Sequence, residues 1–264
     1  MNALADDSPT GPLAQRRIVV TRPEGQAAGL VQAIREAGGE PVCIPAIEIR
    51  PLGDTVAFDA LADRLSSFDL AVFVSRNAVR CGLDLLRRRL GHAWPADLRV
   101  ATVGQGSRAE LEREGFRGVI APAAGSDSEA LLAAPELAEV SGWRVVIFRG
   151  EGGRPLLGEV LERRGAHVEY AACYRRLRPR HDDFAALWGR GADAVAVSSA
   201  EGLDNFLAML GNDAPARLEG VALFVPHTRV AQAAARRGLD DAIVAGPGDA
   251  QMLAALVAYF AAAR

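Results

Sequence analysis

The sequence contains no lysine, and all 30 of its basic residues are arginine. This absence excludes enzymes that form a lysine Schiff base, as well as nucleotide hydrolases and protein kinases whose phosphate-binding motifs require a lysine. Any anion that the protein binds is therefore held by arginine side chains, hydroxyls, backbone N–H groups or helix N-termini.

Cysteine and histidine are also scarce. The cysteines lie far apart and form no Cys-x-x-Cys pair, and the histidines are equally scattered. We expect neither a disulfide framework nor a metal site, and free thiols are typical of a cytoplasmic protein. These residues are Cys43, Cys81, Cys173, His92, His167, His181 and His227.

Long apolar runs are missing as well. No run reaches the roughly 18 residues of a membrane span, and the first 15 residues lack the pattern of a signal peptide. We expect no membrane partner and interpret residues 1–15 as a disordered leader. With 33 acidic and 30 basic residues, the net charge of −3 also argues against a nucleic-acid partner.

Short apolar segments alternate with amphipathic ones along the chain, whose 264 residues are enough for about two domains. The apolar segments are continuous rather than alternating, which is typical of strands in a parallel sheet covered on both faces. About ten strands are predicted, among them residues 118–121. The fold class is therefore α/β, with open, doubly wound parallel sheets.

The sequence also repeats itself at long range. Phe73-Val74-Ser75 corresponds to Ala196-Val197-Ser198, 123 positions later, and Gly38-Gly39 corresponds to Gly165-Ala166, 127 positions later. Solenoid repeats are far shorter, so this period indicates an internal duplication of one five-stranded unit.

Two extended, proline-terminated segments, residues 46–51 and 173–179, occupy equivalent places in the two repeats. If both are crossovers, residues 16–47 and 176–264 form a discontinuous first domain and residues 51–171 form the second. The linkers are then residues 48–50 and 172–175. Ligands of such sheets bind at the carboxyl ends of strands, which predicts a site in an interdomain cleft.

Small polar residues and arginines follow several predicted strands, each close to the start of a helix. There they can cap the helix or, together with its free N–H groups, bind carboxylates or phosphates. Any one of them is accounted for by capping, whereas the set on matching edges of both repeats favours anion binding. The candidates are Thr21, Arg22, Pro23, Ser75, Arg76, Asn77, Gly104, Ser107, Arg149, Gly150, Arg154, Ser198, Ser199, His227 and Thr228.

An alternative reading starts from Gly104-x-Gly106-x-x-Ala109, which fits the glycine fingerprint of dinucleotide-binding folds. No acidic residue ends a following strand to bind a ribose. Asp127 lies at a suitable distance but belongs to a predicted helix cap, so this alternative rests on the glycines alone.

Tyr174 is the candidate for proton chemistry. It lies among Arg175, Arg176 and Arg178, whose charges are expected to lower the phenol pKa and make the hydroxyl a better acid. The other interpretation is a residue that packs at a hinge.

The sequence resembles the uroporphyrinogen-III synthase family from about Arg17 to the C-terminus. It departs from the family at Ser198-Ser199-Ala200, where Ser-Pro-Ser is frequent, and at His227, whose role is open. The resemblance rests on Thr21-Arg22-Pro23, Gln26-Ala27, the run Phe73 to Val79, Val103-Gly104 with Ser107, Arg149-Gly150 with Gly153-Arg154, Tyr174, Val197-Ser198, Pro226 with Thr228, and Met252-Leu253.

The resemblance implies two flavodoxin-like domains joined by a two-stranded linker, with the active site in the cleft between them. It implies a cofactor-free lyase, expected to be a monomer, that cyclises a linear tetrapyrrole polycarboxylate with Tyr174 as the acid. A non-catalytic two-domain protein that binds small anions is the competing interpretation, because the same strand ends would serve either.

Overall fold

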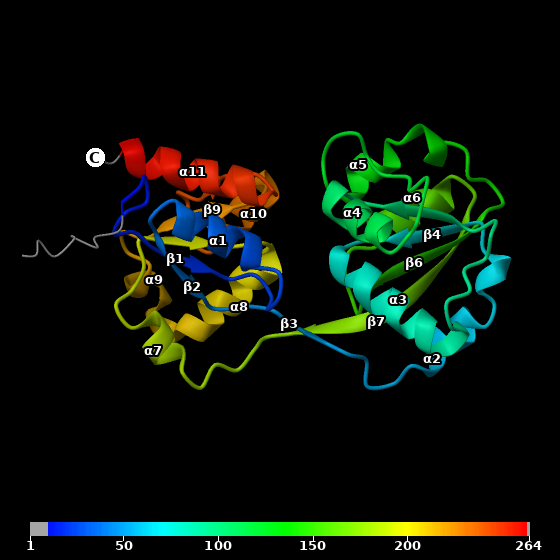
Figure 1. Cartoon of the computed structure of the whole chain (residues 1–264), viewed down its shortest axis with the longest axis horizontal. Coiled ribbons are helices and arrows are strands. Elements are labelled where there is room, and N and C mark those ends of the chain that lie inside the picture. Colours follow the sequence, from blue (N-terminus) through cyan, green and yellow to red (C-terminus); the bar gives the residue numbers. More distant parts are fainter. Residues whose placement is uncertain (1–9, 263–264) are drawn as a thin grey trace, which may run out of the picture. The chain divides into compact units, whose positions relative to one another are not determined.

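The computed structural model describes residues 10–262, and the chain divides into two compact units. Residues up to Glu48 and from Leu177 onward form the first unit, and Ile49–Arg176 form the second. The chain therefore passes between the units twice. Each unit contains one five-stranded sheet (Figure 1).

The sheet of the first unit has the strand order β10-β9-β8-β1-β2, and all of its neighbouring strands are parallel. The apolar strand residues are buried on both faces, as continuous apolar runs predict. The strands are β1 (Arg17–Val20), β2 (Glu40–Cys43), β8 (Ala194–Ala196), β9 (Ala222–Val225) and β10 (Ile243–Val244).

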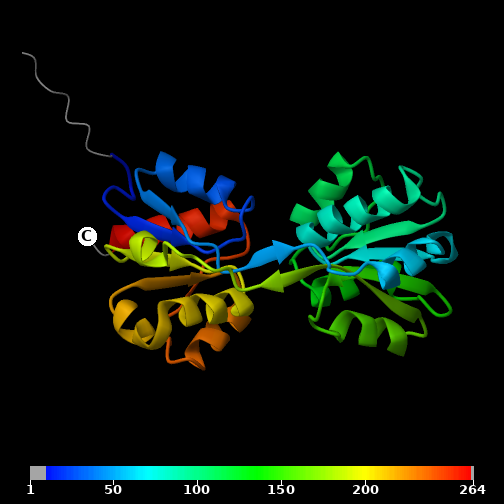
Figure 2. The same cartoon turned by 90° about the horizontal axis from the view of Figure 1, so that it is seen from below.

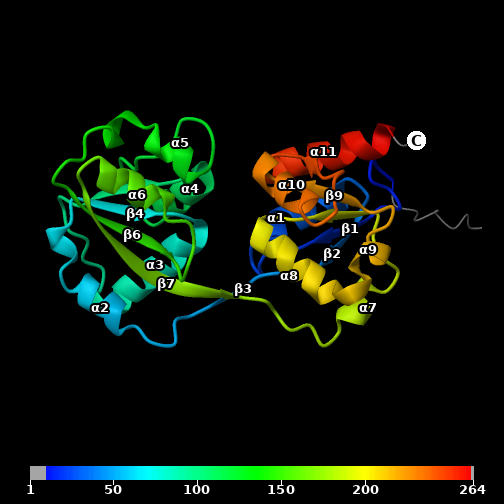
Figure 3. The same ribbon diagram turned by 180° about the vertical axis from the view of Figure 1, so that it is seen from behind.

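Helices cover both faces of this sheet. On one face pack α1 (Ala28–Glu36) and α11 (Asp249–Ala262), through Leu30, Ile34 and Leu256 among others. The other face is covered by helices that follow the second crossing of the chain (Figure 3). They are α7 (Phe184–Trp188), α8 (Ala200–Leu210), η3 (Gly211–Asp213), α9 (Ala214–Arg217) and α10 (Thr228–Ala235).

The second unit has the strand order β3-β7-β6-β4-β5. Its strands are β3 (Glu48–Arg50), β4 (Leu70–Phe73), β5 (Arg99–Thr102), β6 (Arg144–Gly150) and β7 (His167–Leu177). One face is covered by α2 (Val56–Ala62), η1 (Leu65–Ser67), α3 (Arg76–Leu90) and α4 (Gln105–Arg113). The other face is covered by α5 (Ser128–Leu132), η2 (Pro135–Leu137) and α6 (Leu156–Arg163) (Figure 2).

Four strands follow the same order in the two sheets, as the repeat predicts, and the fifth strand differs: β10 lies beside β9, whereas β3 lies beside β7. β6 and β7 begin 127 residues after β1 and β2, while β4 and β5 begin 124 and 123 residues before β8 and β9. The order β2-β1-β8-β9 of the first unit is thereby repeated as β7-β6-β4-β5. Both units are doubly wound α/β folds of the flavodoxin-like order.

Three details differ from the sequence prediction. The expected strand at residues 118–121 is reduced to one bridge between Ala101 and Ile120. Strand β3 comprises residues 48–50 and strand β7 continues to Leu177, so both segments expected to be linkers, residues 48–50 and 172–175, are part of the second sheet. The apolar pattern predicts a helix over residues 24–37, but helix α1 begins at Ala28, because Gly25 has a φ of 74°, outside the helical region.

The expected disordered leader is wrong for residues 10–15, whereas residues 1–9 lie outside the described part of the chain. Leu13 is fully buried in the core formed with α1 and α11, and its N–H donates to the Ala37 carbonyl at 2.9 Å. Gly11 packs so closely against Ala37 that a Cβ would lie 2.4 Å from its oxygen. Polar composition suggested disorder, but this one leucine anchors the segment.

Candidate active site

The candidate residues of the second unit gather at the carboxyl edge of its sheet. Ser75 follows β4, Gly104 follows β5, and Gly150 ends β6. Because these strands are parallel, their carboxyl ends lie at one edge. Tyr174 joins them from β7, where it is paired with Gly150.

Ser75 makes two interactions there. Its backbone is extended and its side chain caps α3, accepting a hydrogen bond from the Ala78 N–H at 3.0 Å. The same Oγ lies 3.1 Å from the hydroxyl oxygen of Tyr174, and either hydroxyl can be the donor. The predicted cap and the predicted acid thus meet in one hydroxyl pair at a helix N-terminus.

Tyr174 reaches Ser75 because of a β-bulge. The pairing of β6 with β7 runs from Arg149–Ala172 directly to Gly150–Tyr174, so Cys173 is left over. Along a regular strand successive side chains point to opposite faces, but here Cys173 and Tyr174 both enter the core beneath α3. The bulge therefore turns Tyr174 toward α3 and Ser75.

The Tyr174 ring packs directly against Gly150. A Cβ at this position would lie 2.8 Å from Cε2 and 2.9 Å from Cζ of the ring, well inside van der Waals contact. Only glycine fits this close approach. The ring is 2% exposed.

The pKa of Tyr174 shifts in the direction opposite to the sequence prediction. Burial, which disfavours the phenolate, raises the pKa above its ordinary value. The hydrogen bond from Ser75 and the charge of Arg176 lower it, but by less. The prediction was wrong because it counted the neighbouring arginines without the desolvation that the fold imposes.

The four arginines among the candidate residues differ in their partners. Arg154 forms a two-pronged ion pair with Glu129, at 2.9 and 3.0 Å. Arg149 donates to the Gly152 carbonyl and stacks over the Tyr170 ring, with Cζ 4.8 Å from its centroid.

Arg22 and Arg76 complete the comparison. Arg22, whose side chain is 11% exposed, is paired with Asp249 at the start of α11. Arg76, the first residue of α3, is exposed and forms no ion pair with the residues from 10 to 262. Within residues 10–262, Arg76 and Arg149 are the two of the four that form no ion pair, and only Arg76 of these two is exposed.

Helix α4 offers uncapped N–H groups at the same edge. Its N-cap is Gly104, which has no side chain to accept from them, and a Cβ there would lie 3.0 Å from Ser126 Cβ. Ser107 is 6% exposed, and its backbone N–H donates to the Gly104 carbonyl at 3.1 Å. Asn77, in the first turn of α3, is half-buried.

The dinucleotide alternative finds no support in this loop. The side chain of Asp127 caps α5, accepting from the Ala130 N–H at 2.9 Å, as the cap pattern predicted. Gly104 lies close to Ser126, and Gly106 lies beside Arg76, with its Cβ position 3.6 Å from the arginine Cδ. Both glycines are thus accounted for by contacts within the unit.

The candidates of the first unit lie at the carboxyl edge of its own sheet. Thr21 does not cap a helix, since its hydroxyl donates to the Ala196 carbonyl at 3.0 Å and is buried. Ser199 caps α8 by accepting from the Gly202 N–H at 3.0 Å, next to the half-buried Ser198.

The remaining candidates of this unit have no capping side chain. His227 is the N-cap residue of α10, yet its side chain makes no capping hydrogen bond, and the exposed Thr228 begins the helix. Pro23 is buried after the first strand.

Several residues of the site have no signal in the sequence. Cys173 acts through the geometry of the bulge. Glu129 and Asp249 form ion pairs with arginines that lie 25 and 227 positions away in the chain. Only a motif that includes the partner could have revealed them.

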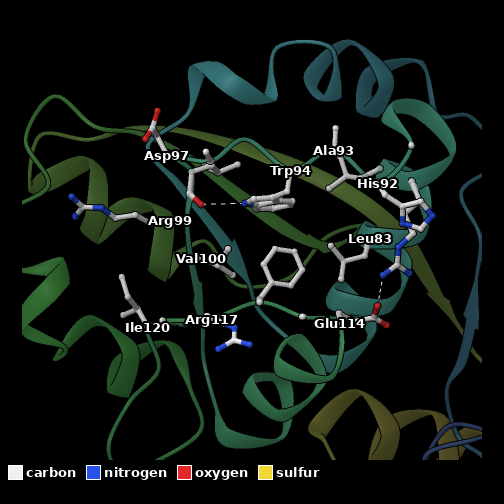
Figure 4. A pocket seen from close by; sticks show the side chains of 18 of the residues that line it. Leu83, His92, Ala93, Trp94, Asp97, Arg99, Val100, Glu114, Arg117 and Ile120 are labelled. Atoms are coloured by element: carbon white, nitrogen blue, oxygen red, sulfur yellow. Dashed lines mark hydrogen bonds and ion pairs between the residues drawn. The ribbon is translucent and has the colours of Figure 1, made fainter.

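A pocket lies at the other end of the second sheet. It has a volume of about 720 Å³ and is lined by the end of α3, the start of β5 and the segment after α4. Trp94 forms part of its wall, and its Nε1 donates to the Leu98 carbonyl at 3.2 Å (Figure 4). The charged lining, three arginines against three carboxylates, gives no net attraction for anions.

Neither a metal-ligand cluster nor a membrane-spanning helix is present in residues 10–262. Within this range, no three His, Cys, Asp or Glu side chains are grouped as metal ligands. No helix within it is long and apolar enough to cross a membrane.

The fold and these residues define a duplicated, doubly wound α/β protein with hydroxyl and arginine groups at its strand ends. The family model described as Uroporphyrinogen-III synthase HemD matches residues 28–254. The chain is 34% identical to the uroporphyrinogen-III synthase of Salmonella typhimurium over 198 residues, 73% of this chain and 79% of that protein. It is 32% identical to that of Escherichia coli over 199 residues, 73% of this chain and 79% of that protein.

The chain thus belongs to the uroporphyrinogen-III synthase family, which consists of lyases of porphyrin biosynthesis. Solved structures agree in fold. The uroporphyrinogen-III synthetase of Helicobacter pylori matches with a TM-score of 0.63 at 14% identity, covering 92% of this chain and 99% of that one. A mutant uroporphyrinogen III synthase of Thermus thermophilus matches with a TM-score of 0.61 at 18% identity, covering 94% of this chain and 100% of that one.

Proposed function

We propose that the chain converts hydroxymethylbilane into uroporphyrinogen III, and that the Tyr174–Ser75 hydroxyl pair assists the loss of water that starts the reaction. The observation that carries this assignment of roles is the 3.1 Å contact between the two hydroxyls at the N-terminus of α3. Membership of the family disfavours the two alternatives, a non-catalytic anion-binding protein and a dinucleotide-binding protein.

The first step is the departure of the substrate hydroxyl. Ser75 Oγ already accepts from Ala78, and its own hydrogen can be donated to the phenol oxygen of Tyr174. The phenolic O–H is then free to point at the departing hydroxyl. The C–O bond breaks as the pyrrole nitrogen supplies its electron pair, and the phenol supplies the proton that completes the water molecule.

The pyrrole N–H then loses its proton, which restores the phenol and leaves a neutral azafulvene. The substituted carbon of the terminal pyrrole ring attacks this electrophile, and the spirocyclic intermediate fragments and recloses with that ring inverted. Each step is a proton transfer or a rearrangement of bonds within the substrate. No electron acceptor is required, so the proposal includes no cofactor.

Burial sets the character of Tyr174 in this scheme. Burial raises the phenol pKa, so Tyr174 stays protonated at neutral pH and can donate its hydrogen, as a weaker acid than a phenol in water. A donor in a dry site stabilises a departing hydroxyl more than the same donor in water does. The Ser75 hydrogen bond lowers the pKa and so eases the partial transfer of the proton.

The acetate and propionate groups of the substrate are carboxylates, and the groups that can bind them lie at the carboxyl edges of the two sheets. In the second unit we assign them to Arg76 and to the N-termini of α3 and α4, with Gly104 and Ser107. Arg76 is the best placed, because it is exposed and forms no ion pair within residues 10–262, whereas Arg149 is half-buried and already donates to the Gly152 carbonyl. The other proposed contacts are Thr21, Arg22, Pro23, Asn77, Arg149, Gly150, Arg154, Ser198, Ser199, His227 and Thr228.

Arg22 and Arg154 would have to exchange Asp249 and Glu129 for a substrate carboxylate. Such an exchange replaces one ion pair by another and contributes more to orientation than to affinity.

The experiment that tests the function is an isomer analysis. Pure protein is incubated with freshly prepared hydroxymethylbilane, and the oxidised products are separated into type I and type III. Enzymatic activity predicts type III product at a rate proportional to protein concentration. Type I product alone, at the rate found without protein, would contradict the proposal.

A further inference from the structure

Cys173 is the extra residue of the bulge that directs Tyr174. We propose that Cys173 is a positioning residue, whose thiol fixes the bulge and thereby holds the Tyr174 hydroxyl against Ser75. This inference rests on the proposed role of Tyr174, and the experiment below separates the two.

The first observation is the partner of the thiol. Cys173 Sγ lies 3.2 Å from the carbonyl oxygen of Arg149, the residue at which the register between β6 and β7 shifts. A bulge disrupts the ladder locally and leaves its extra residue outside the regular pairing. Here the thiol hydrogen supplies a donor to the carbonyl beside the shift.

The second observation is a closed ring of contacts. Cys173 Sγ also lies 3.8 Å from the carbonyl oxygen of Ala78, in the first turn of α3. The N–H of Ala78 donates to Ser75 Oγ, which in turn contacts the Tyr174 hydroxyl. Cys173 and Tyr174 are neighbours in the chain, so this series of contacts is closed.

The thiol has one hydrogen and two acceptors, and the shorter contact identifies the Arg149 carbonyl as the principal one. The longer contact orients Cys173 toward α3. Through these two contacts a single side chain relates the end of β6 to the helix that presents Ser75.

The surroundings keep the thiol in its donor form. Cys173 is 2% exposed, and burial raises its pKa far above the ordinary value. A thiolate at this position would be a pure acceptor facing two carbonyl oxygens. The residue therefore acts as a neutral donor and has no role as a nucleophile.

Two substitutions separate hydrogen bonding from packing. Cys173→Val fills the space and suits a strand but lacks a donor, whereas Cys173→Ser keeps a donor and fills the space less well. If the residue serves only packing, valine is the milder change. If it positions Tyr174, serine is the milder change.

The measurement is kcat and KM for hydroxymethylbilane, with Tm recorded for each variant. We expect Cys173→Val to lower kcat about twofold to tenfold, the equivalent of one hydrogen bond, with KM unchanged. Cys173→Ser should recover most of the loss. Cys81→Val is the matched control, because Cys81 is half-buried against the same core and should leave kcat unchanged.

The same substitution is then made in a Tyr174→Phe background. A residue that acts through the Tyr174 hydroxyl has no further effect once the hydroxyl is gone. An equal loss in both backgrounds, or a serine variant worse than the valine variant, would overturn the proposal. If Cys173→Val does not fold, Cys173→Ala provides the same comparison.

The two hypotheses fail in different ways. If Tyr174→Phe alone leaves kcat unchanged, the catalytic role of Tyr174 is wrong. If Tyr174→Phe lowers kcat while Cys173→Val does not, only the positioning role of Cys173 is wrong.

Discussion

Replacing Gly150 by alanine is the sharpest perturbation of the hydroxyl pair, since it touches neither hydroxyl. The added Cβ would meet three ring atoms of Tyr174, at 2.8, 2.9 and 3.3 Å. These atoms belong to a rigid, buried ring rather than to the flexible end of a side chain. The ring has to move by roughly 0.5–1 Å to restore ordinary contact.

This displacement of the ring determines how much stability and turnover are lost. The Tyr174 and Ser75 oxygens are 3.1 Å apart, so a shift of this size stretches the contact beyond hydrogen-bond range. Overpacking costs about 1–3 kcal/mol of stability, and the lost hydrogen bond about 0.5–1.5 kcal/mol. We expect a Tm lower by several degrees and a kcat reduced at least tenfold, because misplaced catalytic groups lose rate steeply.

The assay is steady-state turnover of hydroxymethylbilane with Tm measured on the same preparations. Gly53→Ala is the matched control, since its Cβ would meet nothing within 4 Å, and both values should stay unchanged. A Gly150→Ala protein that folds and turns over at the wild-type rate would refute the reasoning about the Tyr174 position.

Three further predictions follow from the same contacts. Ser75→Ala removes the α3 cap and the partner of Tyr174 together, so we expect a loss of about 1 kcal/mol in urea unfolding and a lower kcat. Arg76→Gln should raise KM severalfold with kcat nearly unchanged, as measured in steady-state kinetics, because its charge is available to a substrate carboxylate. Above about pH 8.5 the unfolding free energy should fall, because burial raises the pKa of Cys173 and Tyr174 and the unfolded chain releases these protons first.

Each of these has its own control. Ser199→Ala removes the cap of α8 and should lower the unfolding free energy about as much as Ser75→Ala does. It should not produce the decrease in kcat that Ser75→Ala causes through Tyr174. If Arg76→Gln lowers kcat and leaves KM alone, the arginine serves chemistry rather than binding.

The alkaline loss has a definite size and sign. Between its unfolded and folded pKa, each buried group lowers the unfolding free energy by up to about 1.4 kcal/mol per pH unit. At neutral pH it causes no such decrease. Cys173→Val should therefore flatten the curve between about pH 8.5 and 10 in urea titrations. An identical slope in wild type and variant would show that the thiol titrates as if exposed.

Much of the fold is predictable because its causes are local. Continuous apolar runs such as Leu70–Phe73 predict buried parallel strands, and the repeat predicts the order of the four strands that the two sheets have in common. Ser75 is identified as a cap by its position between a strand and a helix.

The details of the site depend on tertiary contacts instead. The bulge at Cys173 arises from pairing between two strands, and nothing in the local sequence distinguishes it from a regular strand. The raised pKa of Tyr174 follows from burial by α3 and Gly150, which outweighs the neighbouring arginine charge. Arg22 looked available because its partner Asp249 is 227 residues away.

The most direct test of the hydroxyl pair compares Tyr174→Phe with wild type in one assay, recording kcat, product isomer and Tm. Because its raised pKa makes Tyr174 a weaker acid than a phenol in water, we expect at least a severalfold fall in kcat, short of the roughly hundredfold of an ideal acid. The Tm and the type III product should be retained. A Tyr174→Phe protein with the wild-type kcat would contradict the role proposed for this hydroxyl.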